Sequence, residues 1–280
     1  MYPPEVRIPL AAVLASVLAV GCARDPGKPP AAATLDAAGD AVADATVDAL
    51  AEAGEEEDAG ELYEPAPSAT TMLRPDAPNL HYAALDQARC EAELEHRSIA
   101  FVRGEPTAGV LAPVRLRGPL HGVTIHSAIP AAQIPKASLE LFDCRLVLAL
   151  DDFTALAAKH DIVEMIHLSV YRSRAAGGCT SKYDGQQHCG ALAIDVGTFK
   201  KRDGSVLSVE KDFAGHIGGI TCGPAAHPAT TPAGRELWGL VCDAADRALF
   251  NVILTPNFNA QHFNHFHLEI TPKARWMLIH

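Results

Sequence analysis

The chain has 280 residues, with 34 acidic against 23 basic side chains and a formal net charge of −11. Eleven of the acidic residues, and no Lys or Arg, lie between residues 31 and 65, so the rest of the chain is electrically balanced. This balance argues against nucleic acid as a partner, because phosphate binding needs a net basic face.

The N-terminal quarter predicts an export signal followed by a tether. The apolar run from Ile8 to Val20 is too short to span a bilayer and is typical of a signal peptide, here residues 1–21. The residues that end at Cys22 resemble the lipobox of bacterial lipoproteins, which implies lipidation of Cys22; plain secretion and a buried helix are the alternatives. Residues 22–76 are acidic and Ala-rich, which predicts a disordered tether. We therefore expect a lipid-anchored protein of the bacterial envelope, on the outer membrane and facing the periplasm.

Residues 77–280 are predicted to form one domain, because their charge is moderate and no internal repeat is visible. Periodic apolar residues predict helices at 83–95, 146–160 and 235–250, and strands at 122–126, 162–171, 191–196, 253–254 and 265–270. In the second of these strands, Ile166, Leu168 and Val170 are the expected core face. Helices and strands alternate irregularly, which favours an α+β fold, an antiparallel sheet with flanking helices.

Six cysteines follow the tether. An even number in an exported chain predicts disulfides, and six cysteines allow fifteen pairings among which sequence cannot choose. Pairing each cysteine with its nearest available neighbour gives Cys179–Cys189, Cys90–Cys144 and Cys222–Cys242.

The predicted strand at 265–270 carries imidazoles on one face. Alternate side chains of a strand share a face, so His265, His267 and Glu269 point one way while Phe266 and Leu268 point into the core. A lone strand histidine is ordinarily a satisfied polar residue, and a histidine run can be a surface metal trap. Here the interleaved apolar residues tie the imidazoles to a packed strand, which favours a metal site.

A second segment supplies further metal donors. His188 stands at the mouth of the buried strand predicted at 191–196, which carries Asp195. Zinc prefers nitrogen, oxygen and sulfur ligands, and catalytic zinc sites commonly use three protein groups and leave one position for water. The chain therefore has the donors for a mononuclear zinc site.

Three short segments carry a family resemblance: Val170-Tyr171-Arg172-Ser173, His188 to Asp195, and His265-Phe266-His267. They resemble the core of the LAS zinc peptidases, which include VanY-like D,D-carboxypeptidases and penicillin-insensitive murein endopeptidases. The usual central motif of that group is S-x-H-x-x-G-x-A-x-D. This chain departs from it with Gln186 in place of Ser and Ala191 in place of Gly, which affects substrate contacts but not the ligands.

Within that group the chain is most similar to the extensin-like C-terminal domain family, over most of residues 82–270. The resemblance implies a LAS or D-Ala-D-Ala peptidase-like zinc site whose Zn²⁺ ligands are His188, Asp195 and His267. Glu269 shares the ligand face, where it can accept a hydrogen bond from a ligand imidazole, and a surface carboxylate is the alternative.

The resemblance also implies catalytic residues. His262 and His265 match the additional histidines of the murein endopeptidases, with His265 as the base and His262 orienting water or steadying the intermediate, two roles that can be exchanged. Arg172 matches an arginine that holds a substrate carboxylate or a developing oxyanion, against the alternative of a solvated turn residue.

Together these features predict an envelope zinc metallopeptidase that hydrolyses a peptide bond in peptidoglycan stem peptides or crosslinks. The alternative from another class is a non-catalytic, zinc-stabilised wall-binding module. A non-haem iron oxygenase is a third hypothesis, disfavoured because its first histidine and its carboxylate usually stand two residues apart, whereas His188 and Asp195 stand seven apart.

Overall fold

The computed structural model describes residues 70–175, 177 and 179–280. Its strands are β1 Thr70–Met72, β2 Phe101–Arg103, β3 Pro113–Leu116, β4 Thr124–Ser127, β5 Phe142–Asp143, β6 Ile162–Ser169, β7 Ala193–Lys201, β8 Val206–Ser208, β9 Val252–Leu254, β10 Phe266–Glu269 and β11 Trp276–Ile279. Its α-helices are α2 Pro78–Ala83, α3 Gln87–His96, α4 Cys144–Ala157, α5 Val209–Asp212 and α6 Pro232–Asp246. Its 3₁₀ helices are η1 Ile134–Lys136, η2 Ser138–Glu140, η3 Ala158–His160, η4 Ser181–Tyr183, η5 Gln187–Gly190 and η6 Ala260–His262.

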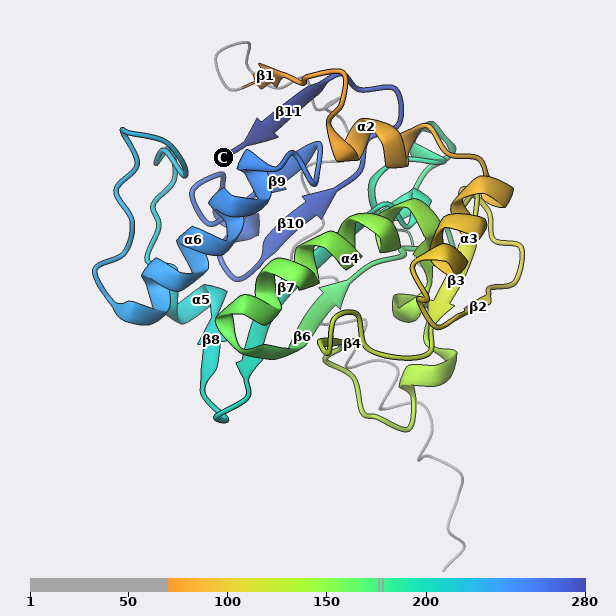
Figure 1. The fold of residues 1–280 in the computed structure, drawn as a ribbon, viewed down its shortest axis with the longest axis horizontal. Helices are drawn as coiled ribbons and strands as arrows, with labels where there is room; N and C mark the ends of the chain where they lie inside the picture. Colours follow the sequence, from red (N-terminus) through yellow and green to blue (C-terminus); the bar gives the residue numbers. More distant parts are fainter. Residues whose placement is uncertain (1–69, 176, 178) are drawn as a thin grey trace, which may run out of the picture. The chain divides into compact units, whose positions relative to one another are not determined.

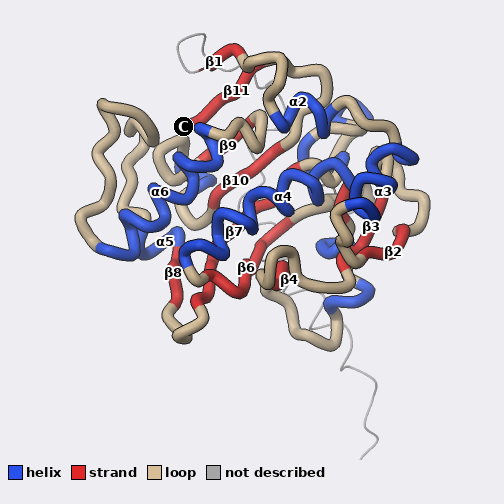
Figure 2. The backbone as a smooth tube through the Cα atoms, viewed as in Figure 1, coloured by secondary structure: helices blue, strands red, loops and turns tan. Residues whose placement is uncertain are grey.

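The main sheet has the strand order β1, β11, β9, β10, β7, β6, β4, and β8 pairs with the second half of β7 (Figure 2). Neighbouring strands are antiparallel except for two parallel pairs, β11 with β9 and β4 with β6. Strands β2, β3 and β5 form a separate antiparallel sheet. The predicted α+β class with a mostly antiparallel sheet is therefore confirmed.

Helices α4 and α6 lie over one face of the main sheet (Figure 1). Phe153 of α4 contacts Phe199 of β7, with ring centroids 6.5 Å apart. Trp238 of α6 stacks on Phe213 at 4.6 Å, and the Phe213 ring contacts Phe266 of β10 at 5.3 Å. The apolar core therefore occupies the helix side of the sheet, and polar side chains of β7 and β10 must occupy the other side.

The helices predicted at 146–160 and 235–250 are present as α4 and α6, but the single helix predicted at 83–95 is wrong. The chain instead forms α2 and α3. The Asp86 side chain accepts a hydrogen bond from the backbone N–H of Arg89, so it caps a new helix and interrupts the apolar periodicity. The strands predicted at 122–126, 253–254 and 265–270 are present as β4, β9 and β10.

The predicted core face of the strand at 162–171 is wrong. Leu168 is 42% exposed and Ile166 is half-buried, although Val170 is buried. Met165 and His167, which strict alternation places on the opposite face from Ile166 and Leu168, have no exposed surface. The register between β6 and β7 shifts here, and a β-bulge interrupts the alternation of faces on which the prediction rested.

The three predicted disulfides are confirmed. They are Cys90–Cys144, Cys179–Cys189 and Cys222–Cys242. The first joins α3 to α4, the second ties η5 to the loop before it, and the third fastens the loop between α5 and α6 to α6. Each bridge therefore fixes a loop or a helix that sheet hydrogen bonds do not hold.

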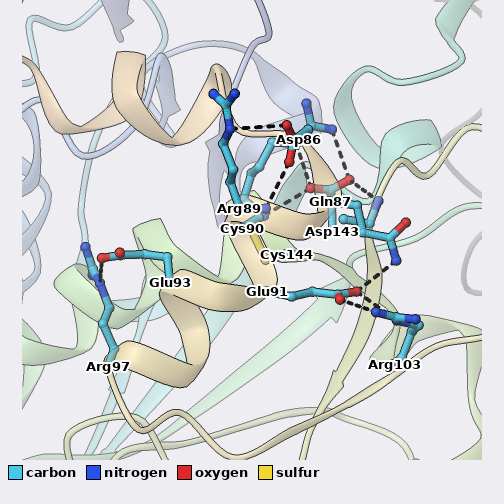
Figure 3. The surroundings of a disulfide bond; sticks show 12 residues. Asp86, Gln87, Arg89, Cys90, Glu91, Glu93, Arg97, Arg103, Asp143 and Cys144 are labelled. Carbon is cyan, nitrogen blue, oxygen red and sulfur yellow. Dashed lines mark hydrogen bonds and ion pairs between the residues drawn. A yellow bond between two sulfur atoms is a disulfide. The ribbon is translucent and has the colours of Figure 1, made fainter.

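A buried ion pair lies next to the first disulfide. Figure 3 shows Asp143 beside Cys144 at the start of α4. One Asp143 oxygen accepts from Arg145 Nε at 2.8 Å, and the other accepts from Arg145 Nη2 at 3.0 Å and from the Ala112 backbone N–H at 3.2 Å. Both charged side chains are almost fully buried, so neither can lose its partner without a large penalty.

The predicted signal peptide at 1–21, the lipidation site Cys22 and the tether as far as residue 69 lie outside the described residues. The remaining part of the predicted tether contains β1, which pairs antiparallel with β11. Within the described part of the chain, no helix combines the length and the apolar character needed to cross a bilayer.

The Asp143–Arg145 pair gives a stability test. We expect Asp143→Asn to lower the free energy of unfolding by about 3 kcal/mol, because Asn keeps the helix cap but leaves a buried guanidinium without a counter-charge. Urea unfolding followed by circular dichroism measures the change. The control Asp203→Asn, in an exposed turn, should change it by less than about 0.5 kcal/mol, and equal effects of the two variants would contradict the assignment.

Candidate metal centre

Three buried donors converge on the face of the sheet opposite the helices. Asp195 of β7 and His267 of β10 are direct antiparallel partners, so their side chains lie side by side. His188 comes from η5, just before β7. One ligand atom from each of the three lies within 4.8 Å of the other two, and the residues are 2–8% exposed.

A β-bulge allows β7 to place some side chains in the apolar core and others in the candidate metal site. Val196 and Phe199 are both fully buried, although a regular strand would place residues three apart on opposite faces of the sheet. The register with β6 skips Gly197 between them, which marks a β-bulge. A Cβ atom at Gly197 would lie 3.3 Å from the Asn264 carbonyl oxygen, so a larger residue would push that backbone away. Asp195 thereby faces away from the core while its neighbours remain inside it.

His188 is fixed in one tautomer by the backbone. Its Nδ1 lies 2.8 Å from the Val170 carbonyl oxygen, which can only accept, so Nδ1 carries the proton. The Nε2 atom then has a lone pair, and it lies 3.1 Å from Asp195 Oδ2. The Arg172 N–H donates to the His188 carbonyl at 3.2 Å and holds the turn in place.

His267 is oriented in a similar way. Its Nε2 lies 3.2 Å from Glu269 Oε2, and Glu269 Oε1 accepts from the Thr271 hydroxyl at 2.8 Å. Its Nδ1 lies 3.0 Å from Asp195 Oδ1. Glu269 therefore contacts the outer nitrogen of a donor imidazole and is not a surface carboxylate.

The donor set fits a divalent metal ion. His188 has its outer nitrogen on an acceptor, so its inner nitrogen points a lone pair at the carboxylate of Asp195, and His267 does the same once it is deprotonated. Lone pairs that face a carboxylate repel it, and a cation between them removes the conflict. Two nitrogens and one oxygen with oriented outer contacts are a ligand set that zinc accepts.

The charges of the metal-free site follow from burial and from Asp195. Burial lowers the pKa of His188 to about 4. Burial alone would also lower the pKa of His267, but its hydrogen bonds with Asp195 and Glu269 raise that pKa to about 9. Burial would raise the pKa of Asp195, whereas the surrounding imidazoles, His188 first, hold it well below its usual range. Near pH 7 the site therefore holds a carboxylate with a protonated His267.

The two further predicted histidines lie beside the donors. His265 Nε2 is 3.5 Å from Asp195 Oδ1, and the His262 ring is 5.1 Å from the His265 ring and 5.9 Å from the His267 ring. Burial is the main cause that lowers the pKa of His265, and burial with the neighbouring imidazoles lowers that of His262 to about 3. Both rings are therefore neutral near pH 7.

Arg172 also reaches the site. Its Nη2 lies 3.0 Å from Asp195 Oδ2, and its Nε donates to the Ser169 hydroxyl at 3.0 Å. The side chain is 42% exposed, so one edge of the guanidinium remains open to solvent. Arg172 is therefore not a purely solvated turn residue.

The sequence did not reveal the residues that orient His262, His265 and Arg172. Asn259 Oδ1 accepts from the backbone N–H of His262 and lies 2.7 Å from His262 Nδ1, and Asn264 Oδ1 lies 2.7 Å from His265 Nδ1. Ser169 was likewise missed. The sequence could have indicated a role for Asn259, because Asn before a short helix is a typical N-cap. Its contact with the His262 imidazole depends on the three-dimensional turn.

Comparison with known proteins identifies a family for most of the described domain. A family model described as "Extensin-like protein C-terminus" matches residues 86–279, a range that contains the three donors, both further histidines and Arg172. No curated protein and no solved structure matches the chain. The family description names no reaction.

Metal binding should release a proton from His267. Its pKa of about 9 means that the metal-free imidazole is protonated at pH 7, whereas a metal ligand must be deprotonated. We expect about one proton released per Zn²⁺ at pH 7, and an affinity that rises about tenfold per pH unit until about pH 9. Calorimetric titration in two buffers of different ionisation enthalpy measures the proton count, and a count near zero would contradict this protonation state.

The His267 imidazole also makes the stability of the metal-free protein depend on pH. The folded-state pKa of His267 lies above the unfolded value of about 6.5, so its stabilisation is complete below that pH and is lost as the pH rises towards about 9. Thermal unfolding in a chelator should show this loss in the parent. The loss should be absent in His267→Gln and present in the control His96→Gln, which is exposed at the end of α3.

The Cys179–Cys189 disulfide should support metal affinity, because Cys189 adjoins His188 in η5. We expect Cys179→Ser/Cys189→Ser to weaken Zn²⁺ binding about tenfold, the lower end for groups that orient a ligand. The matched control Cys222→Ser/Cys242→Ser removes a bridge elsewhere and should change affinity less than about twofold. Competition with a chromophoric chelator measures both, and equal losses would mean that only general stability is affected.

Proposed function

The chain belongs to the extensin-like C-terminal family, and we propose that it is a zinc-dependent peptidase of the bacterial envelope that hydrolyses a peptide bond in peptidoglycan. The observation that carries the proposal is the orientation of the donors. His188 and His267 have their outer nitrogens on acceptors and their inner nitrogens on the buried carboxylate of Asp195. Two more histidines and an arginine adjoin the same carboxylate or the same rings.

The donor number favours a hydrolytic site over a purely structural one. Structural zinc sites usually have four protein ligands, whereas catalytic sites have three and leave a position for water. His188, Asp195 and His267 supply three. When bound, Zn²⁺ lowers the pKa of a coordinated water towards about 7 and polarises the carbonyl of the scissile bond.

His265 is the best-placed base. Its Nδ1 contacts the Asn264 amide oxygen, so Nδ1 carries the proton and Nε2 keeps a lone pair beside Asp195. The lowered pKa of His265 keeps the ring neutral, so it can accept a proton near pH 7 and pass it to the leaving amine.

His262 is suited to orient water rather than to donate a proton. Asn259 Oδ1 also accepts from the backbone N–H groups of Gln261 and His262, which fixes the amide orientation and requires His262 Nδ1 to donate. The Nε2 atom of His262 is then an acceptor. With a pKa of about 3 the ring stays neutral, so we assign stabilisation of developing negative charge to Arg172 instead.

The substrate class rests on resemblance. Tyr171-Arg172-Ser173 and the segment from His188 to Asp195 are similar to the LAS zinc peptidases, which act on peptidoglycan peptides. The apolar N-terminal run and Cys22 favour placement of the domain in the envelope by a lipid anchor, where that polymer lies. Gln186 and Ala191 depart from the LAS motif, so the peptide that is cut can differ from the usual substrates.

Hydrolysis gives the direct test. Purified protein reconstituted with Zn²⁺ and incubated with muropeptides should release shortened or uncrosslinked stems, which chromatography with mass detection resolves. His265→Ala should lower kcat by about 10²–10⁴-fold, the usual contribution of a general base, with Zn²⁺ content unchanged by elemental analysis. The control His96→Ala should retain parent activity.

The same samples separate the alternatives. Zinc retained with no hydrolysis by the parent, together with sedimentation on purified wall sacculi, would show a wall-binding module instead of a peptidase. Iron in the freshly purified protein, with dioxygen consumption, would show an oxygenase.

A further inference from the structure

A groove of about 310 Å³ adjoins the candidate centre. It lies between α5 with the loop that follows it and the chain around η6, and Asn259, Ala260 and Phe263 line the second side. Asn259 is the residue that contacts His262 Nδ1 at 2.7 Å. Asn259 therefore links the groove to the histidine cluster.

The loop that forms the first wall is held rigidly. Asn257 is fully buried, and its side-chain oxygen accepts from the His216 N–H at 2.8 Å while its carbonyl accepts from the Gly218 N–H at 2.7 Å. A Cβ atom at Gly215 would lie 2.3 Å from the Asn257 side-chain oxygen, so the loop backbone packs directly on this amide. The Cys222–Cys242 disulfide fastens the same loop to α6.

This fixed loop presents an apolar side chain to water. Ile217 is 64% exposed, and Phe263 on the opposite wall is 53% exposed. Val209 and Pro256 add apolar lining between them. Exposed apolar side chains that line a groove next to polar side chains are typical of a ligand site.

The carboxylate that lines the groove indicates which kind of apolar ligand the groove can bind. Glu210 is the carboxylate among the lining residues, and within the described ranges no ion pair involves it. His216 and Asn259 also line the groove, and its apolar side chains together with one unpaired carboxylate match an aliphatic chain that ends in an ammonium group.

We propose that this groove binds an aliphatic, amine-bearing side chain of the peptide substrate and so places the neighbouring peptide bond at the histidine cluster. Ile217 and Phe263 contact the methylene groups, and Glu210 pairs with the ammonium. The assignment rests on the proposed peptidase function, because that function supplies the peptide.

Binding of synthetic peptides to the metal-free full-length protein tests the groove separately from hydrolysis. Three otherwise identical peptides carry lysine, Nε-acetyllysine or norleucine at the residue preceding the bond to be cut, and calorimetry or fluorescence anisotropy gives each Kd. The lysine peptide should bind about two- to fivefold tighter than the other two, the range of an exposed ion pair. Glu210→Gln should abolish this difference and leave norleucine binding unchanged.

The apolar wall needs its own variant. Ile217→Ser should weaken all three peptides about tenfold, because the methylene contacts are lost whatever the terminal group. The matched controls Val206→Ser and Glu105→Gln change an exposed apolar residue and an exposed carboxylate outside the groove, and both should bind like the parent. Thermal unfolding of each variant verifies that it folds.

The possible results separate the two proposals. Peptide discrimination that depends on Glu210 and Ile217 supports the groove even if the zinc-loaded protein hydrolyses nothing, which would refute the peptidase function alone. Hydrolysis by the parent with unchanged selectivity in Glu210→Gln and Ile217→Ser would overturn the groove alone. A dimer in sedimentation velocity that Ile217→Ser dissociates would also overturn it, because a second copy would then cover this wall.

Discussion

The buried carboxylate of Asp195 is the constraint on which the site depends. A carboxylate that is 2% exposed must be compensated, and four side chains approach it: His188, His267, His265 and Arg172. Each of them is oriented in turn by an acceptor at its far end, such as the Val170 carbonyl or Glu269. Because the compensation comes from several directions, the site is preorganised around one point, as a metal ion requires.

The fold provides that point by pairing two strands in register. The β7–β10 pair brings Asp195 next to His267, while Phe266 and Leu268 of β10 pack into the aromatic core beneath α4 and α6. The core and the site thus share the same strands on opposite faces. A shift of one residue between β7 and β10 would move His267 into the core, so the apolar packing also fixes the register of the donors.

The family assignment and the chemistry stand on different observations. The match over residues 86–279 identifies an extensin-like C-terminal domain, and the proposal of zinc-dependent hydrolysis comes from the tautomers and distances of the donors. The groove beside His262 adds a third, separate observation, because α5, the loop after it and the chain around η6 form its walls, and these segments carry none of the three donors and lie outside the sheet. The assignments of the metal site, the groove and the core can therefore be tested separately in one domain.

The α+β class followed from the sequence by itself, because the periodicity of apolar residues is a local property. Pairing each cysteine with its nearest neighbour matched the three disulfides, and the family resemblance selected three residues that the fold brings together. The sequence pattern misassigned Leu168, because a bulge depends on how β6 meets β7. The contact of Arg172 with Asp195, the two parallel strand pairs and the groove were decided only by the tertiary structure. Each of these joins segments far apart in the chain, and no periodicity within one segment encodes which distant segment will pack against it.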